Sequence, residues 1–160
     1  MSKGECITAR VYMLNSSDAP KLKKLLEYDP YLDQNIAPKI PKEWEDPKYL
    51  AEHPEVAKEA EQKKKQAEEA LGNLRNDKEA NVIFARQDYQ LKDGISLGLD
   101  REKSYLYLSA DESFFDGAEA KLKKNVASIE RAKEDVEKQI IDTLEKEKEK
   151  ADQGLGFIFG

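Results

Sequence analysis

Histidine and cysteine, which often serve as nucleophiles, bases and metal ligands, occur once each, as His53 and Cys6. The sequence contains no Gly-rich phosphate loop, no Gly-x-Ser-x-Gly motif, no His-Glu-x-x-His motif and no paired-cysteine motif. His53 precedes Pro54 at an expected helix start, and Cys6 opens an expected strand, so both fit structural roles. We therefore expect no catalytic residue, no resident metal and no cofactor.

Carboxylates are the remaining candidates for acid–base chemistry, and the clearest cluster is Asp111, Glu112 and Asp116. Because the cluster lies at the start of an expected helix, we interpret it as a partner of the helix dipole. A site for a divalent ion is the alternative for this cluster. If the chain is an enzyme, we expect it to use carboxylates together with an external metal ion.

Residues 80–109 alternate between apolar and polar side chains, which is typical of β-strands. A three-residue turn at Lys92-Asp93-Gly94 and a four-residue loop at 100–103 predict a three-strand meander. This register pairs Leu91 with Ile95 and Leu97 with Leu106, so the leucines share one face.

The opposite face of this meander carries polar and aromatic residues that could bind a small ligand or a nucleotide. Tyrosines above small residues on an open sheet can stack on bases, although the same pattern fits a solvated face or a face covered by a helix. A pocket near the single tryptophan is a second candidate. The predicted ligand-binding residues are Arg86, Gln90, Tyr105, Tyr107 and Trp44.

Residues 111–151 are predicted to form one long, heavily charged helix that begins with a capping box at Ser109 and ends at Gly154. Its apolar residues recur at spacings of four and three, which is close to a heptad pattern. A stripe this narrow on so long a helix favours packing against a second copy of the chain. The predicted oligomer seam consists of Leu122, Val126, Ile129, Lys133, Val136 and Ile140.

The remaining segments complete the expected fold. Alternation predicts a strand at 6–14, followed by a short helix that Asp29-Pro30 ends. All six prolines lie within residues 20–54, so 29–53 should be mostly irregular, and a second helix should span Pro54 to Arg75. The apolar segment 155–160 is predicted to be a terminal strand. The sequence thus predicts one α+β domain over residues 1–160, with a mainly antiparallel sheet in the order β-α-α-β-β-β-α-β.

Composition restricts the function classes. The net charge of −6 argues against nucleic acid as a partner, and no apolar run approaches the length of a membrane span. A single cysteine and the absence of a signal-like N-terminus favour the cytoplasm. The excess of Lys and Glu resembles the surface of a thermophile protein.

We therefore expect a non-enzymatic interaction or scaffold protein that assembles through its long helix. The expected assembly is a homodimer or a higher homo-oligomer, with a further protein partner left open. The alternative is the small-ligand or nucleotide-binding module described above.

Overall fold

The structure of the chain, a computed structural model, describes residues 6–159, with side chains as far as Asp152. The chain divides into two compact units, one formed by residues 1–27 and 84–160 and the other by residues 28–83. Each unit is described by itself, and the prediction of a single domain over the whole chain stays a prediction.

Unit 1 contains a four-stranded antiparallel sheet in the order β2-β3-β1-β4. The element order β1-α1-β2-β3-α4-β4 with this strand arrangement is a split β-α-β topology. The predicted α+β class with an antiparallel sheet is confirmed. Its elements are β1 (Ile7–Asn15), α1 (Ala19–Glu27), β2 (Asp88–Asp93), β3 (Lys103–Asp111), α4 (Phe114–Asn125), β4 (Glu130–Arg131) and α5 (Glu134–Phe159), with 3-10 turns η2 (Ser16–Asp18), η5 (Phe84–Arg86) and η6 (Ile95–Leu97).

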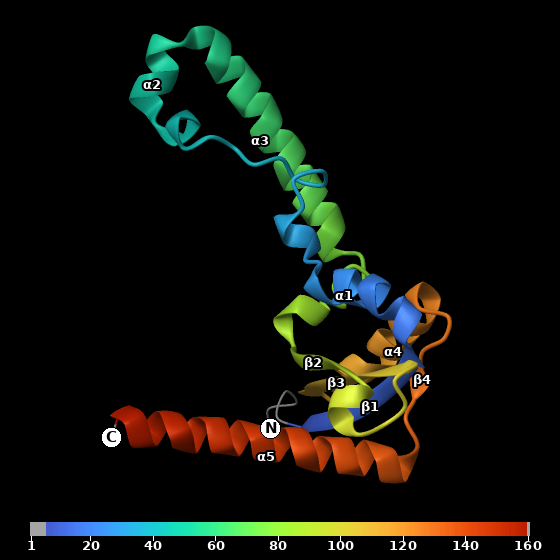
Figure 1. Ribbon diagram of the computed structural model, residues 1–160. Helices are drawn as coiled ribbons and strands as arrows, with labels where there is room; N and C mark the ends of the chain where they lie inside the picture. Colours follow the sequence, from blue (N-terminus) through green and yellow to red (C-terminus); the bar gives the residue numbers. More distant parts are fainter. Residues whose placement is uncertain (1–5, 160) are drawn as a thin grey trace. The chain divides into compact units, whose positions relative to one another are not determined.

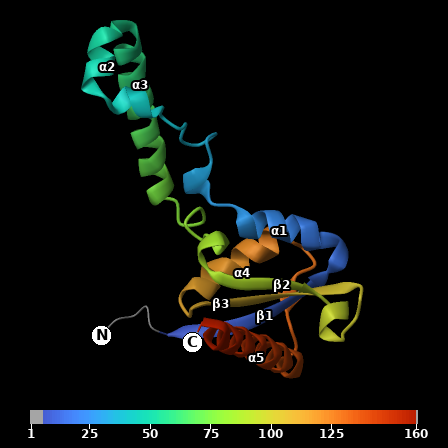
Figure 2. The same ribbon diagram turned by 60° about the vertical axis from the view of Figure 1, so that its left-hand side comes forward.

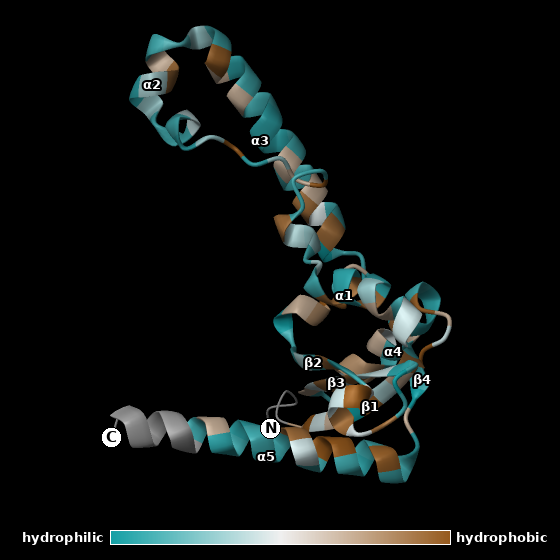
Figure 3. Ribbon diagram, viewed as in Figure 1, coloured by the Kyte–Doolittle hydropathy of each residue, from teal (hydrophilic) through white to brown (hydrophobic). Residues whose placement is uncertain are grey.

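Both faces of the sheet are covered, with α1 and α4 on one side and α5 on the other (Figures 1 and 2). Alternation along β1 turns Tyr12 toward α4, where it bonds Glu119, and Val11 toward α5. Ile140 and Leu144 of α5 pack in one cluster with Val11, and Figure 3 shows apolar residues gathered where α5 meets the sheet. Sheet burial on both sides explains why β1 and β3 are apolar at odd and even positions alike.

Unit 2 is mainly helical and is built around α3 (Pro54–Arg75), whose bounds match the predicted helix. The buried residues of α3 are Ala60, Ala67 and Leu74, which recur at the spacing of one helix face. The Pro-rich segment before it contains η3 (Pro30–Leu32), η4 (Lys42–Glu45) and α2 (Pro47–Glu52), so it holds more short helices than expected.

The prediction of one helix over 111–151 is wrong. Asp111 ends β3, and two helices, α4 and α5, are separated by a connection that contains β4. Lys123 Nζ donates hydrogen bonds to the carbonyl oxygens of Ala127 and Ile129 and so closes the end of α4. The apolar spacing predicted one helix across this break because the buried residues of the connection are spaced as they would be on a helix. Pairing with distant parts of the chain overrides helix propensity there.

The predicted middle strand of the meander is also absent. The chain turns back at Gly94, where an added Cβ would overlap the Asp100 carbonyl oxygen, and Leu99 N–H donates to the Gly94 carbonyl at 2.7 Å. The segment between forms η6 and a left-handed turn at Gly98, whose φ is 73°. β2 therefore pairs directly with β3, and Leu91 lies opposite Leu106 rather than Ile95.

The terminal strand predicted at 155–160 is not among the four strands of the sheet. The last element, α5, extends to Phe159, so positions 155–159 belong to a helix, while Gly160 lies outside the described residues. A short apolar run fits a helix as well as a strand, because periodicity cannot separate the two over so few residues.

Candidate functional site

The outer edge of β1 is one of two sheet edges in unit 1 whose backbone groups are only partly used, since β2 at the other end of the sheet pairs with β3 alone. β4 pairs with β1 at Tyr12 and Met13 alone. Val11 N–H and C=O point away from β3, since they bond the Glu137 side chain and Ala132 N–H. Because backbone groups alternate along a strand, Ala9 and Ile7 point their N–H and C=O groups to the same outer side.

These four groups of Ile7 and Ala9 have no hydrogen-bond partner among the described residues. The Ile7 side chain beside them is 64% exposed. We call residues 6–10 of β1 the free edge. An open row of donors and acceptors on a strand is a template for a further strand.

Glu137 of α5 marks where the free edge ends. Its Oε2 accepts hydrogen bonds from Val11 N–H at 3.0 Å and from Arg131 Nε at 2.7 Å. Burial of the carboxylate raises its pKa, but the hydrogen bonds from Arg131 and Val11 outweigh burial, so the pKa of Glu137 is lowered overall. The carboxylate thus joins α5, β4 and β1 as a charged acceptor.

A Glu137→Gln variant is expected to lower the free energy of unfolding by about 1–3 kcal/mol at neutral pH, because charge-assisted hydrogen bonds are lost. A carboxyl whose pKa is lowered by folding contributes stability above its unfolded pKa and loses it as the pH falls through the folded pKa. The difference between variant and parent should therefore shrink in acid. Urea unfolding at neutral pH and in acid measures it, with Glu134→Gln at an exposed site of the same helix as control. A pH-independent difference would contradict this role.

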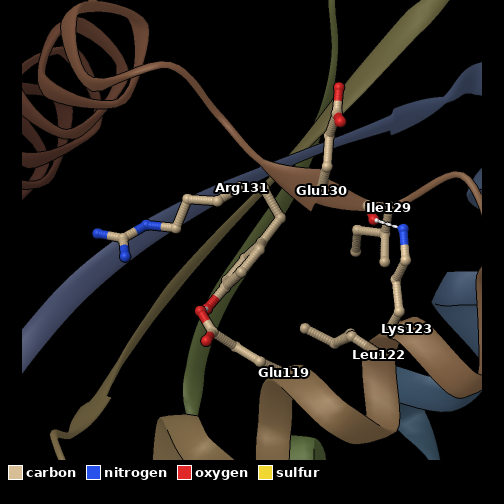
Figure 4. A pocket seen from close by; sticks show the side chains of 7 residues that line it. Glu119, Leu122, Lys123, Ile129, Glu130 and Arg131 are labelled. Atoms are coloured by element: carbon tan, nitrogen blue, oxygen red, sulfur yellow. Dashed lines mark hydrogen bonds between the residues drawn. The ribbon is translucent and has the colours of Figure 1, made fainter.

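A hollow of about 310 Å³ lies between β4 and α4 beside the edge (Figure 4). Tyr12 Oη donates to Glu119 Oε2 at 2.6 Å, and Arg10 Nη1 donates to the same oxygen at 3.0 Å. Burial, followed by the contact with Glu119, raises the pKa of Tyr12. In Figure 4 Glu119 lies at one side of the hollow, whereas the Arg131 and Glu130 side chains point away from it. This network holds β1 onto α4, since the Tyr12 hydroxyl, the Arg10 guanidinium and one carboxylate oxygen of Glu119 bond one another.

The acidic cluster of Asp111, Glu112 and Asp116 lies next to the free edge. Together with Cys6 and Arg10 it lines a shallow hollow of about 420 Å³. Asp111 Oδ1 accepts hydrogen bonds from the Ser113 amide and hydroxyl, which lower the pKa of this carboxyl. The cluster sits at the end of β3 and the start of α4, so it adds negative charge beside Cys6.

The tyrosine face expected to bind a ligand is covered by α5. Tyr105 and Tyr107 are only 6% and 3% exposed, and they belong to the cluster with Ile140 and Leu144. Burial raises the pKa of both tyrosines. The sequence allowed a ligand-binding face, a solvated face or a face covered by a helix, and the structure has the covered face. The two tyrosine rings therefore offer no open surface for stacking.

The other predicted ligand-binding residues are dispersed. Gln90 lies opposite Tyr107 in the β2–β3 ladder, and Arg86 ends η5. Trp44 lies in unit 2, where Lys63 Nζ stands 5.2 Å from the centre of its ring. Gln90 therefore shares the covered face of the sheet with Tyr107, Arg86 precedes β2, and Trp44 belongs to the other unit.

The predicted oligomer seam does not form a stripe. Leu122 lies in α4, Val126 and Ile129 in the following connection, and Ile140 in α5, and each is at most 2% exposed within the single chain. Val136 packs partly against the cluster under the sheet, and Lys133 is exposed between β4 and α5. Sequence spacing placed these residues on one helix, whereas the fold distributes them over α4, the following connection and α5 and buries four of the six.

No known protein family, curated protein or solved structure matches the chain. Over the described part of the chain, none of the helices combines the length and apolarity needed to cross a bilayer. Within the same part, no group of three His, Cys, Asp or Glu side chains is placed to hold a metal ion.

Proposed function

We propose that the chain is a non-enzymatic interaction protein that assembles with a second copy of itself through the free edge of β1. The observation that carries the proposal is the set of four outward backbone groups on Ile7 and Ala9, beyond the point where Glu137 and β4 occupy the strand. The proposal keeps self-association as the expected function and moves it from the long-helix seam to the sheet edge.

A two-fold axis through Thr8 uses all four free groups. Two antiparallel copies of β1 then place Ile7 opposite Ala9 of the second copy, and each such pair exchanges two hydrogen bonds. Thr8 faces Thr8 of the second copy as a non-hydrogen-bonded pair. The shared ladder spans residues 6–10, which is the whole length left open before Val11. A two-fold interface of this kind is self-complementary and closes at two chains.

Charge favours a second copy as the occupant of this edge. In the same register Cys6 lies opposite Arg10 of the second copy, and Cys6 shares its hollow with Asp111, Glu112 and Asp116. Each copy therefore brings one guanidinium, that of Arg10, toward the acidic cluster of the other copy, whose hollow its own Arg10 already lines. The contact occurs once on each side of the axis. Complementary charge of this kind steers association and selects the register.

The side chains near the edge support binding rather than catalysis. The Glu119 carboxylate accepts from Tyr12 and Arg10, and the Glu137 carboxylate accepts from Arg131 and a backbone amide. These internal hydrogen bonds hold the edge of the sheet against α4 and α5. Acid–base catalysis, in contrast, requires a carboxylate that exchanges a proton with a substrate.

Ala9→Pro is expected to abolish self-association. The Ala9 N–H points outward, so proline removes a donor to the second copy without removing a hydrogen bond to β3. Sedimentation equilibrium of the full chain at micromolar concentration measures the result. Ala9→Ser, which keeps the N–H, is the matched control and should remain a dimer.

A second variant guards against misfolding of the proline variant. Ile7→Lys changes an exposed side chain on the edge and adds charge to the interface, so it should weaken the dimer while the circular dichroism spectrum stays unchanged. A parent chain that sediments as a monomer would overturn the proposal, and so would a dimer that both folded variants leave intact.

A further inference from the structure

A second hollow of unit 1, of about 630 Å³, lies between the start of α1 and the connection that joins β2 to β3. Part of its wall is apolar and comes from Ala19, Pro20, Leu91 and Ile95. The Ile95 side chain is 62% exposed, although it is large and apolar. The apolar part of a small ligand can pack against this wall.

Two cations stand at the same hollow, the Lys23 ammonium and the Arg101 guanidinium. Neither makes a hydrogen bond or an ion pair with the described residues. The carboxylate in the wall, Asp93, accepts the Ser96 amide at 2.8 Å, and this bond lowers its pKa. Two unpaired cations facing one internally bonded carboxylate leave local positive charge on a chain whose net charge is −6.

The backbone that carries Arg101 is held in place before any ligand arrives. Ser16 N–H donates to the Glu102 carbonyl at 2.8 Å, and Ser16 Oγ donates to the Arg101 carbonyl at 3.0 Å. The Ser16 and Ser104 hydroxyls also share a hydrogen bond of 3.2 Å, and Ser104 is only 3% exposed. Because these bonds fix the connection to η2, its backbone loses little conformational entropy when a ligand binds.

We infer that this hollow binds a small organic anion with an apolar body, such as an aromatic carboxylate or an aromatic phosphate monoester. The anionic group pairs with Arg101 and Lys23, because a guanidinium fork matches the oxygens of carboxylate and phosphate. The body rests on Leu91 and Ile95. The inference is independent of self-association, since neither Arg101 nor Lys23 belongs to the free edge.

Titration of the ¹⁵N-labelled full chain with phenyl phosphate, benzoate, benzyl alcohol and inorganic phosphate tests the inference by amide chemical shifts. Phenyl phosphate or benzoate should produce saturable shifts at Ser16, Arg101 and Ser104, and comparison of the two identifies the preferred anionic group. Benzyl alcohol and inorganic phosphate should bind at least about tenfold more weakly, because each lacks one half of the interaction.

Arg101→Gln should weaken the aromatic anion by about tenfold, which corresponds to the loss of a charge-assisted contact. Arg75→Gln, at an exposed arginine of unit 2, is the matched control and should leave the affinity unchanged. Absence of saturable shifts with both aromatic anions would overturn the inference. Equal affinity for inorganic phosphate, or equal affinity in the Arg101→Gln variant, would overturn it as well.

Discussion

Leu144→Ala is expected to lower the free energy of unfolding of unit 1 by about 2–5 kcal/mol, the range for deleting a large side chain from a packed core. Leu144 is 1% exposed and belongs to the cluster in which α5 packs against Tyr105 and Tyr107. The loss should be the same at every protein concentration, because the partners of Leu144 lie in its own chain. Urea unfolding over a range of protein concentrations measures both the size of the loss and its dependence on concentration.

The matched control is Thr143→Ala, one position earlier on the exposed side of α5. It removes a hydroxyl that donates to the Gln139 carbonyl of the same helix, so its effect should stay within about 0.5 kcal/mol. A destabilisation by Leu144→Ala that appears only at concentrations where the chain is dimeric would mean that α5 packs between chains. That outcome would contradict its place under the sheet.

Periodicity predicted the fold correctly in those segments whose pattern fits only a strand or only a helix. The alternation of Ala9, Arg10 and Val11 correctly assigned β1 and its two faces, and Pro54 correctly marked the start of α3. These signals are local, and the fold preserves them. The shared leucine face was predicted only in part, because Leu91 lies opposite Leu106 in the ladder, whereas Leu97 lies in η6 and packs against the cluster that contains Tyr105 and Tyr107.

The break between α4 and α5 could not be predicted from spacing. Val126 and Ile129 fit a helical stripe, but in the fold they are core residues of a connection, and Ser128 bonds Asp18 in a different part of the sequence. The two-residue strand β4 exists because Tyr12 and Met13 provide a ladder for it. A pairing across more than a hundred residues leaves no local signal in the sequence.

The candidate site was missed for a related reason. The sequence identifies β1 as a strand, but the free edge follows from the shortness of β4 and from the Glu137 side chain that occupies Val11 N–H. Backbone donors and acceptors are present at every residue, so only the three-dimensional pairing shows which of them remain open. Lys23 and Arg101 likewise reach the same hollow through the β2–β3 connection, most of which was predicted as a strand before the loop at 100–103.

The geometry of the proposed dimer gives Thr8 a special place, because it is the residue on the two-fold axis. Opposed residues of a non-hydrogen-bonded antiparallel pair have Cα atoms about 4.5 Å apart, within the range that a disulfide spans. A cysteine at this position can therefore bond its counterpart in the second copy. Within the shared ladder of residues 6–10, Thr8 is the one residue that lies opposite its own counterpart.

The most direct test of the proposed assembly is oxidative cross-linking of Thr8→Cys in a Cys6→Ser background, followed by non-reducing electrophoresis. We expect conversion to a covalent dimer, while Thr143→Cys in the same background remains a single chain. If Thr8→Cys cross-links no more than Thr143→Cys, the two copies of β1 do not meet at Thr8 and the proposed self-association through the free edge is wrong.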